Sequence, residues 1–176
     1  MKKNKFLKFS IILLLFSSCG VIVNYDYDKD TNFSEYTTYN YFSDIKSGLS
    51  EFDTRRLYRA LDAKLESIGI TKSDNPTFYI DIQSKVIESR SNSNVGIGLG
   101  GTGRNVGGGV SIGIPVGGNA HNREIVIEFV DDNNNEKVIW QAVSADTYGA
   151  DSTPEKREAK FIALVEKIFK KYPPKK

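Results

Sequence analysis

The chain has 176 residues and carries 24 Lys and Arg against 22 Asp and Glu, a formal net charge of +2. Four of the lysines lie within the first eight residues. The rest of the chain therefore has a slight acidic excess and lacks the positive charge on which nucleic-acid binding depends. With one Cys and one His, the chain can form no internal disulfide and lacks the clustered ligands of most zinc sites.

The first segment, Met1–Cys19, is typical of a secretory signal. Its lysines precede an apolar run, Phe9–Phe16, that is too short to span a bilayer as a helix. The sequence Ser17-Ser18-Cys19-Gly20 resembles the lipobox of bacterial lipoproteins, in which the cysteine is lipidated and becomes the first residue. We therefore predict a cleaved signal over residues 1–18 and a single lipid-anchored domain over 19–176. A buried structural cysteine behind an ordinary signal is the alternative.

Two stretches near the start of this domain predict short strands. Apolar and aromatic residues alternate with polar ones over 21–28, and residues 37–42 are rich in Thr, Tyr and Phe. Five of the nine tyrosines lie between Tyr25 and Tyr41. Packing within the strands is the favoured interpretation of these tyrosines, and an aromatic platform for a ligand is the alternative.

An amphipathic helix is predicted over residues 50–68. Ser50 and Asp53 have the spacing of a capping box, and Gly69 suits the C-terminal cap. The predicted apolar face consists of Leu57, Leu61, Leu65 and Ile68. Three arginines, Arg55, Arg56 and Arg59, are interpreted as part of a solvated face rather than as an anion site.

The later part of the chain predicts further strands and a second helix. Alternation over 78–87 indicates a long strand, and alternation over 125–130 and 138–143 indicates a hairpin. The last helix is predicted over 154–171, with Thr153 as its N-cap and Pro at its first position.

Between these elements, residues 95–118 hold 11 of the 15 glycines. Aliphatic residues alternate with glycine on both sides, which predicts the two arms of a β-ribbon with 101–109 as its tip. The ribbon either folds back over a sheet edge or protrudes as an apolar finger toward a partner or membrane. Its candidate partner-binding residues are Val95, Ile97, Leu99, Val110, Ile112 and Ile114.

Four short strings match enzyme or nucleotide-binding motifs without the context that those motifs require. G-x-G-x-x-G at 96–103 opens no helix, so nucleotide binding is not expected. G-x-S-x-G at 109–113 is followed by Pro, which cannot supply the helix after a nucleophile elbow. S-x-x-K at 43–46 and S-D-N at 73–75 lack the third element, K-T-G. An envelope hydrolase using His121, with Ser111 as its candidate nucleophile, is the least favoured alternative.

Acidic residues likewise form no complete site in the sequence. Asp131, Asn133 and Asn135 match the first ligands of an EF-hand loop, but Glu136 replaces its essential glycine. We therefore predict no metal ion and no other cofactor. Asp26 and Asp28 share one polar face of a predicted strand, which places them poorly for a glycosidase cleft.

Several stretches together resemble the bacterial lipoprotein family called domain of unknown function 4136. They are the Asn24-Tyr25-Asp26 strand after the lipobox, Asn32–Tyr41, Asn75–Phe78, Val138–Ala142, and the helix from Pro154–Arg157 to Ile168–Pro174. The resemblance implies an envelope lipoprotein with an α+β sandwich and no established catalytic residues.

The predicted fold class is α+β: a predominantly antiparallel sheet of five to seven strands, two amphipathic helices on one face, and the glycine-rich ribbon. The functional hypothesis is a non-enzymatic accessory or binding module. It would be held through Cys19 at the periplasmic face of the outer membrane and bind an envelope protein rather than a nucleic acid or nucleotide. A carrier of lipid or glycan, using the tyrosines and the ribbon, is the main alternative.

Overall fold

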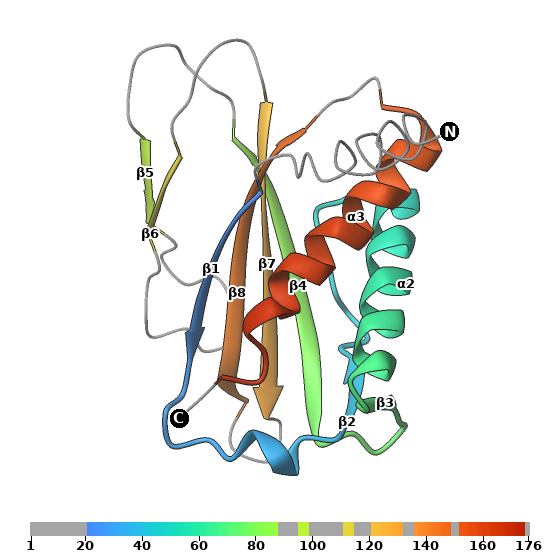
Figure 1. The fold of residues 1–176 in the computed structure, drawn as a ribbon, viewed down its shortest axis with the longest axis vertical. Helices are drawn as coiled ribbons and strands as arrows, with labels where there is room; N and C mark the ends of the chain where they lie inside the picture. The colour runs from blue at the N-terminus through green and yellow to red at the C-terminus, as the bar shows by residue number, and fades with distance from the viewer. Residues whose placement is uncertain are drawn as a thin grey trace, which may run out of the picture.

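The computed structural model describes residues 21–87, 95–98, 111–114, 121–131, 136–148 and 152–174. Most of these residues form one six-stranded sheet and two α-helices (Figure 1). The sheet contains β1 (Ile22–Tyr27), β2 (Thr38–Tyr41), β3 (Thr71–Lys72), β4 (Phe78–Ile87), β7 (His121–Asp131) and β8 (Lys137–Tyr148). The helices are α2 (Glu51–Ser67) and α3 (Pro154–Ile168), with short 3-10 turns η2 (Phe33–Glu35) and η4 (Phe169–Lys171).

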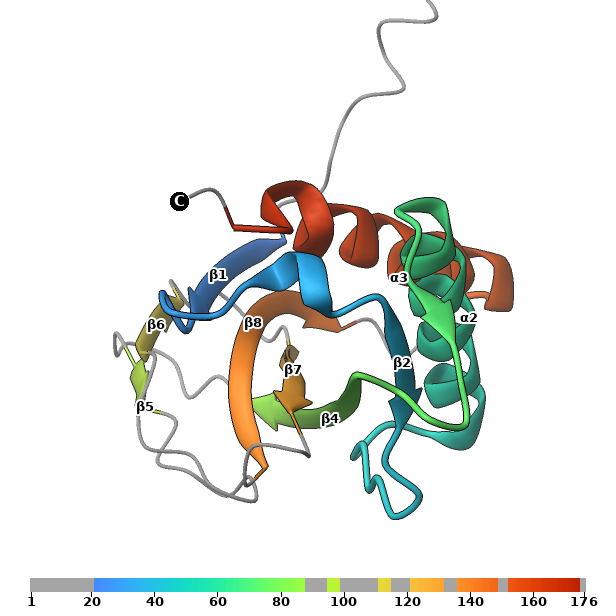
Figure 2. The ribbon, with the colours of Figure 1, turned by 90° about the horizontal axis from the view of Figure 1, so that it is seen from below.

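The strands follow the order β1-β8-β7-β4-β2-β3. The pairs β1–β8, β8–β7 and β7–β4 are antiparallel. Strand β2 runs parallel to both of its neighbours, β4 and β3. The sheet curves, and α2 and α3 lie together on its concave side (Figure 2). The predicted α+β class, strand number and placement of the helices are confirmed. The two-residue strand β3 was not predicted.

Local sequence signals fix the beginning of each helix. The Ser50 hydroxyl accepts a hydrogen bond from the Asp53 backbone N–H, and the Thr153 hydroxyl accepts one from Lys156. Pro154 occupies the first turn of α3, where no intrahelical N–H bond is lost. Gly69, with φ of +84°, follows the end of α2 in the left-handed region that glycine favours. Within the described ranges, no helix has both the length and the apolar character needed to cross a bilayer.

The core between sheet and helices is rich in aromatic side chains. The Phe129 ring lies 4.5 Å from Phe78 and 4.7 Å from Trp140, measured between ring centroids. Phe169 and Tyr172, which follow α3, pack against Trp140 at 5.8 and 5.4 Å. Burial of each large apolar side chain stabilises the folded state by about 1.5–3 kcal/mol. The packing of Phe169 and Tyr172 in this cluster therefore holds the C-terminal segment against the sheet.

The predicted ribbon forms a separate two-stranded sheet of β5 (Val95–Gly98) and β6 (Ser111–Ile114). Val95 pairs with Ile114, and Ile97 pairs with Ile112. The pairing of the two arms is thus confirmed. Both views place β5 and β6 on the side away from the helices (Figures 1 and 2).

Candidate functional site

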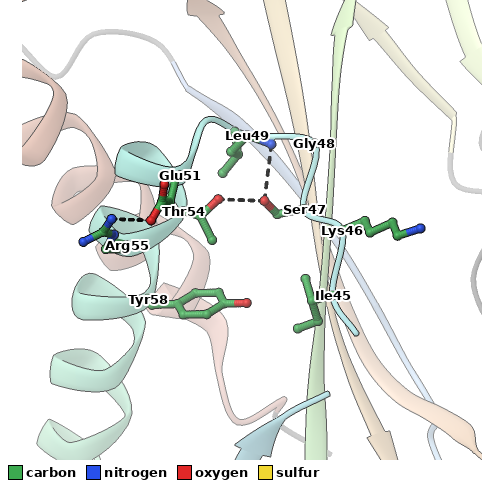
Figure 3. A pocket seen from close by; sticks show the side chains of 9 residues that line it. All are labelled: Ile45, Lys46, Ser47, Gly48, Leu49, Glu51, Thr54, Arg55 and Tyr58. Carbon is green, nitrogen blue, oxygen red and sulfur yellow. Dashed lines mark hydrogen bonds and ion pairs between the residues drawn. The ribbon is translucent and has the colours of Figure 1, made fainter. Parts of the chain in front are cut away.

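A pocket of about 530 Å³ lies between residues 45–49 and the first turns of α2 (Figure 3). The Ser47 and Thr54 hydroxyl oxygens lie 2.8 Å apart, and the Leu49 backbone N–H donates to Ser47 Oγ. Arg55 and Glu51 form an ion pair at its rim. Lys46 points away from the pocket (Figure 3). The polar groups of this pocket are therefore largely engaged with one another.

The structure does not assemble the S-x-x-K and S-D-N strings into one site. Lys46 lies beside the first turns of α2, whereas Ser73–Asn75 follow the end of that helix. There the Ser73 hydroxyl accepts a hydrogen bond from the Asn75 backbone N–H, and the Asn40 side chain donates to the Ser73 carbonyl oxygen. This turn geometry agrees with the interpretation of the second string as a turn.

A larger groove of about 960 Å³ lies between strand β1 and the end of the chain. One wall consists of residues 170–174, and β1 supplies the other. The β1 residues that line it are Val23, Asn24, Tyr25 and Tyr27. Its volume lies at the upper end of the range of small-molecule sites, and an extended peptide can also enter such an open groove.

The groove combines aromatic rings with basic side chains. Lys171 Nζ lies 5.5 Å from the centroid of the Tyr25 ring, and Lys170 is exposed beside it. Within the described residues, no carboxylate pairs with either lysine. Tyr25 donates a hydrogen bond to the Lys167 carbonyl oxygen at 2.7 Å, and burial raises the pKa of its hydroxyl. The groove therefore presents two cations that an acidic ligand could pair with.

Tyr36, Tyr39 and Tyr41 make hydrogen bonds within the fold, as the favoured interpretation of the sequence expected. Tyr39 and Tyr41 both donate to Asp62 Oδ1, at 2.6 and 2.7 Å. Tyr36 donates to Asp131 Oδ2, and burial raises the pKa of its hydroxyl to about 12. Of the five tyrosines between positions 25 and 41, Tyr25 and Tyr27 are the two that line the groove.

The arginines of α2 are tied to carboxylates rather than freely solvated. Asp53 is 2% exposed and lies 2.9 Å from Arg56 and 2.9 Å from Arg157. A third guanidinium, that of Arg123, lies 3.6 Å from Asp53 and also over the Phe161 ring. The prediction of a fully solvated arginine face was therefore wrong for Arg56, because α3 and β7 bury the carboxylate that it pairs with.

Two more buried acids lie on the β7 face turned away from the helices. Glu124 is 1% and Glu128 is 4% exposed, and burial raises the pKa of both carboxyl groups. Gln141 donates a hydrogen bond to Glu128. In the part of the chain that the structure describes, no three His, Cys, Asp or Glu side chains gather as a potential metal site.

Asp26 and Asp28 do not form a catalytic pair. Asp26 is exposed, whereas Asp28 accepts hydrogen bonds from Lys137 at 2.6 Å and Thr31 at 2.7 Å. The hydrogen bond from Lys137 is the main cause that lowers the pKa of Asp28 to about 2. A carboxyl group with this pKa stays ionised at neutral pH and cannot serve as a general acid.

This pKa predicts a pH-dependent contribution of Asp28 to stability. The carboxylate stabilises the fold fully above its unfolded pKa of about 4, and this stabilisation is lost as pH falls toward about 2. At pH 7, we expect Asp28→Asn to lower the free energy of unfolding by at most about 1 kcal/mol. Urea titrations should show the difference between the two proteins shrinking from pH 4 to pH 2. A difference independent of pH would contradict this origin.

Several predicted site residues lie outside the described residues or in strands of which only the pairing is described. Cys19 lies outside the described residues, as do Leu99 and Val110 of the predicted ribbon surface. Val95, Ile97, Ile112 and Ile114 lie in β5 and β6, where only the strand pairing is described. His121 begins β7 and Ser111 begins β6. Their proposed roles stay predictions.

Comparisons with known proteins agree on the fold. The model of a family described as Domain of unknown function (DUF4136) matches residues 23–174. A PDZ domain protein from Parabacteroides distasonis is 14% identical, with a TM-score of 0.59 over 96% of this chain and 40% of its own. The chain thus spans less than half of that protein. A DUF4136 family protein from Bacteroides thetaiotaomicron is 15% identical, with a TM-score of 0.52 over 87% of this chain and 96% of its own.

None of the curated proteins compared with the chain matches it. At 14% and 15% identity, the two solved structures establish similarity of fold and not of ligand or partner.

Proposed function

Because the chain belongs to the DUF4136 family, we propose that it is a lipid-anchored envelope protein that acts as a non-enzymatic binding module in a membrane-associated assembly. Lipidation of Cys19 would hold the domain at the periplasmic face of the outer membrane, since two or more acyl chains suffice for stable anchoring. The domain would then act through a surface that recognises another envelope component.

The observation that carries this proposal is the groove between β1 and residues 170–174. It is open, has both aromatic and basic lining residues, and lies along a strand at the edge of the sheet. An edge strand beside such a groove offers backbone hydrogen-bonding groups as well as side chains to a partner.

Site-specific photo-crosslinking in cells tests this function. Tyr27, which lines the groove and is 37% exposed, is replaced by a photoreactive phenylalanine derivative. Phe52, an aromatic residue on α2 that is 68% exposed, receives the same replacement as the matched control. We expect a discrete protein adduct from position 27 and none from position 52, identified by affinity purification and mass spectrometry. The same pattern of adducts from both positions, or none from either, would contradict the proposal.

The predicted ribbon is tested in the same experiment by a variant lacking residues 95–118. Loss of the adduct in an otherwise folded variant would assign the ribbon to the same binding surface. An unchanged adduct would remove the ribbon from the proposed surface.

A lipid or glycan carrier is the second candidate function, and the aromatic lining of the groove favours it. Tyr25 and Tyr27 present rings on which a sugar or an acyl chain can pack. Lipid or glycan that co-purifies with the unlipidated Cys19→Ala protein, and is lost when Tyr27 becomes Ala, would favour this candidate.

A further inference from the structure

Strand β1 has one edge with which no described strand pairs. It lies first in the sheet order, so only β8 pairs with it. The Asp28 backbone N–H donates to the Ile139 carbonyl oxygen, which makes these two residues a hydrogen-bonded antiparallel pair. Because such pairs alternate along an antiparallel ladder, Asn24 and Asp26 also bond toward β8. The N–H and C=O groups of Val23 and Tyr25 consequently point outward.

These outward backbone groups have no hydrogen-bond partner within the described residues. No backbone hydrogen bond of Val23 or Tyr25 is found outside the pairing of the strands. By contrast, the Tyr27 N–H is bonded to the Asp26 side chain, and the Val21 carbonyl oxygen accepts from Lys167. The central part of the edge therefore offers two donors and two acceptors, the pattern that an added strand requires.

The two sides of this edge differ in charge. Val23, Tyr25 and Tyr27 point to the helix side, where Lys170 and Lys171 form the wall of the groove. Asp26 points to the opposite side and is exposed. In a strand added to β1, the side chains that enter the groove would meet the two lysines, and the alternate side chains would lie near Asp26. The preferred strand thus has acidic residues at every second position.

From this arrangement we infer that the groove binds an extended, acidic segment of a partner protein, which adds to the sheet along β1. The inference rests on the proposed binding function and specifies the chemistry and geometry of its partner. Backbone hydrogen bonds to Val23 and Tyr25 provide affinity. Pairing of alternate acidic side chains with Lys170 and Lys171 provides register, because a shift by one residue turns those side chains away from the lysines.

A second copy of the chain fits the same edge less well. Two β1 strands paired about a two-fold axis normal to the sheet would place both helix sides on one face. The lysines at positions 170 and 171 of both copies would then face each other across the axis, and like charges in such positions repel.

Fluorescence anisotropy with defined peptides tests the inference on the full-length protein purified from membranes in detergent. The probes are labelled peptides about as long as β1, with alternating Val and Glu, or alternating Val and Lys. We expect the Glu peptide to bind about ten-fold more tightly than the Lys peptide, equivalent to about 1.4 kcal/mol. The double variant Lys170→Glu/Lys171→Glu should abolish or reverse this preference. The double variant Lys46→Glu/Lys156→Glu, which changes two exposed lysines outside the groove, is the charge-matched control.

A second pair of variants tests backbone pairing. Val23→Pro removes an outward N–H that β8 does not use, and proline is tolerated at such an edge position. Val23→Ala shortens the same side chain and keeps the N–H. We expect the dissociation constant of the Glu peptide to be about ten-fold higher for Val23→Pro than for Val23→Ala. Both variants should keep the circular dichroism spectrum of the unchanged protein. Should Val23→Pro unfold, N-methylation of alternate peptide residues tests the same hydrogen bonds from the ligand.

The outcomes separate this inference from the proposed function. The acidic strand is overturned, but the binding module is not, by two results together: the adduct from the photoreactive residue at position 27 persists in Lys170→Glu/Lys171→Glu, and the protein shows no preference for the Glu peptide. Equal effects of Val23→Pro and Val23→Ala overturn backbone pairing. A dimer in analytical ultracentrifugation that Val23→Pro dissociates identifies the occupant as a second copy, which also overturns the inference.

Discussion

Replacing Asp53 by Ala is expected to lower the free energy of unfolding by about 3–5 kcal/mol, because breaking a buried charge pair leaves its partners uncompensated. Asp53 is 2% exposed, and Arg56, Arg157 and Arg123 all point their guanidinium groups at it. These arginines come from α2, α3 and β7, so one carboxylate joins both helices to the sheet. Trp140 is the only tryptophan and is buried, so its fluorescence reports unfolding in urea.

Glu51→Ala provides the matched control for this prediction. Glu51 pairs with Arg55 on the exposed side of the same helix, with 79% of its side chain accessible. Its removal should cost about 0.5 kcal/mol or less. Arg157→Ala, which removes one of the three guanidinium groups, should lie between the two. An Asp53→Ala variant as stable as Glu51→Ala would mean that the arginines turn to solvent once the carboxylate is gone.

Replacing Gly48 by Ala is expected to cost about 2 kcal/mol or more, because two effects add at this position. Gly48 has φ of +72°, a left-handed conformation that a side chain disfavours. A Cβ atom at this position would also lie 2.5 Å from the backbone carbonyl oxygen of Ser84 in β4. The close approach holds the loop beside the pocket of Figure 3 against the sheet.

Gly69→Ala separates the two effects. Gly69 has a similar φ of +84°, but an added Cβ would meet no atom within 4 Å. We expect this variant to cost only about 1 kcal/mol, the conformational part. Urea denaturation of both variants measures the difference. Equal losses of stability would show that the loop around Gly48 can move away from β4.

Local patterns predicted most helices and strands because their signals lie within each segment. The caps at Ser50 and Thr153 and the alternation over 78–87 each depend on neighbouring residues only. Strand β3 has two residues, too few for any alternation to be visible. Its parallel pairing with β2 arises because α2 connects the two strands as a crossover, and this topology depends on the whole sheet.

The candidate site was harder to predict because distant segments form it. The sequence pattern predicts a helix over 154–171, which includes Lys170 and Lys171, and a strand over 21–28, which includes Val23 and Tyr25. Nothing in either local pattern indicates that they lie beside each other or that β1 is an edge strand. Asp53 shows the same limit: its spacing from Ser50 indicated a cap, whereas Arg123 and Arg157 approach it only in the folded chain.

Ile87 at the end of β4 pairs with Asn122 near the start of β7. The chain leaves β4 and enters β7 at opposed positions of the antiparallel pair, so residues 88–120 connect the two strands. The entropic cost of closing such a connection rises by only about 0.6 kcal/mol for each doubling of its length. A change in the length of this connection therefore alters the free energy of pairing β4 with β7 only slightly.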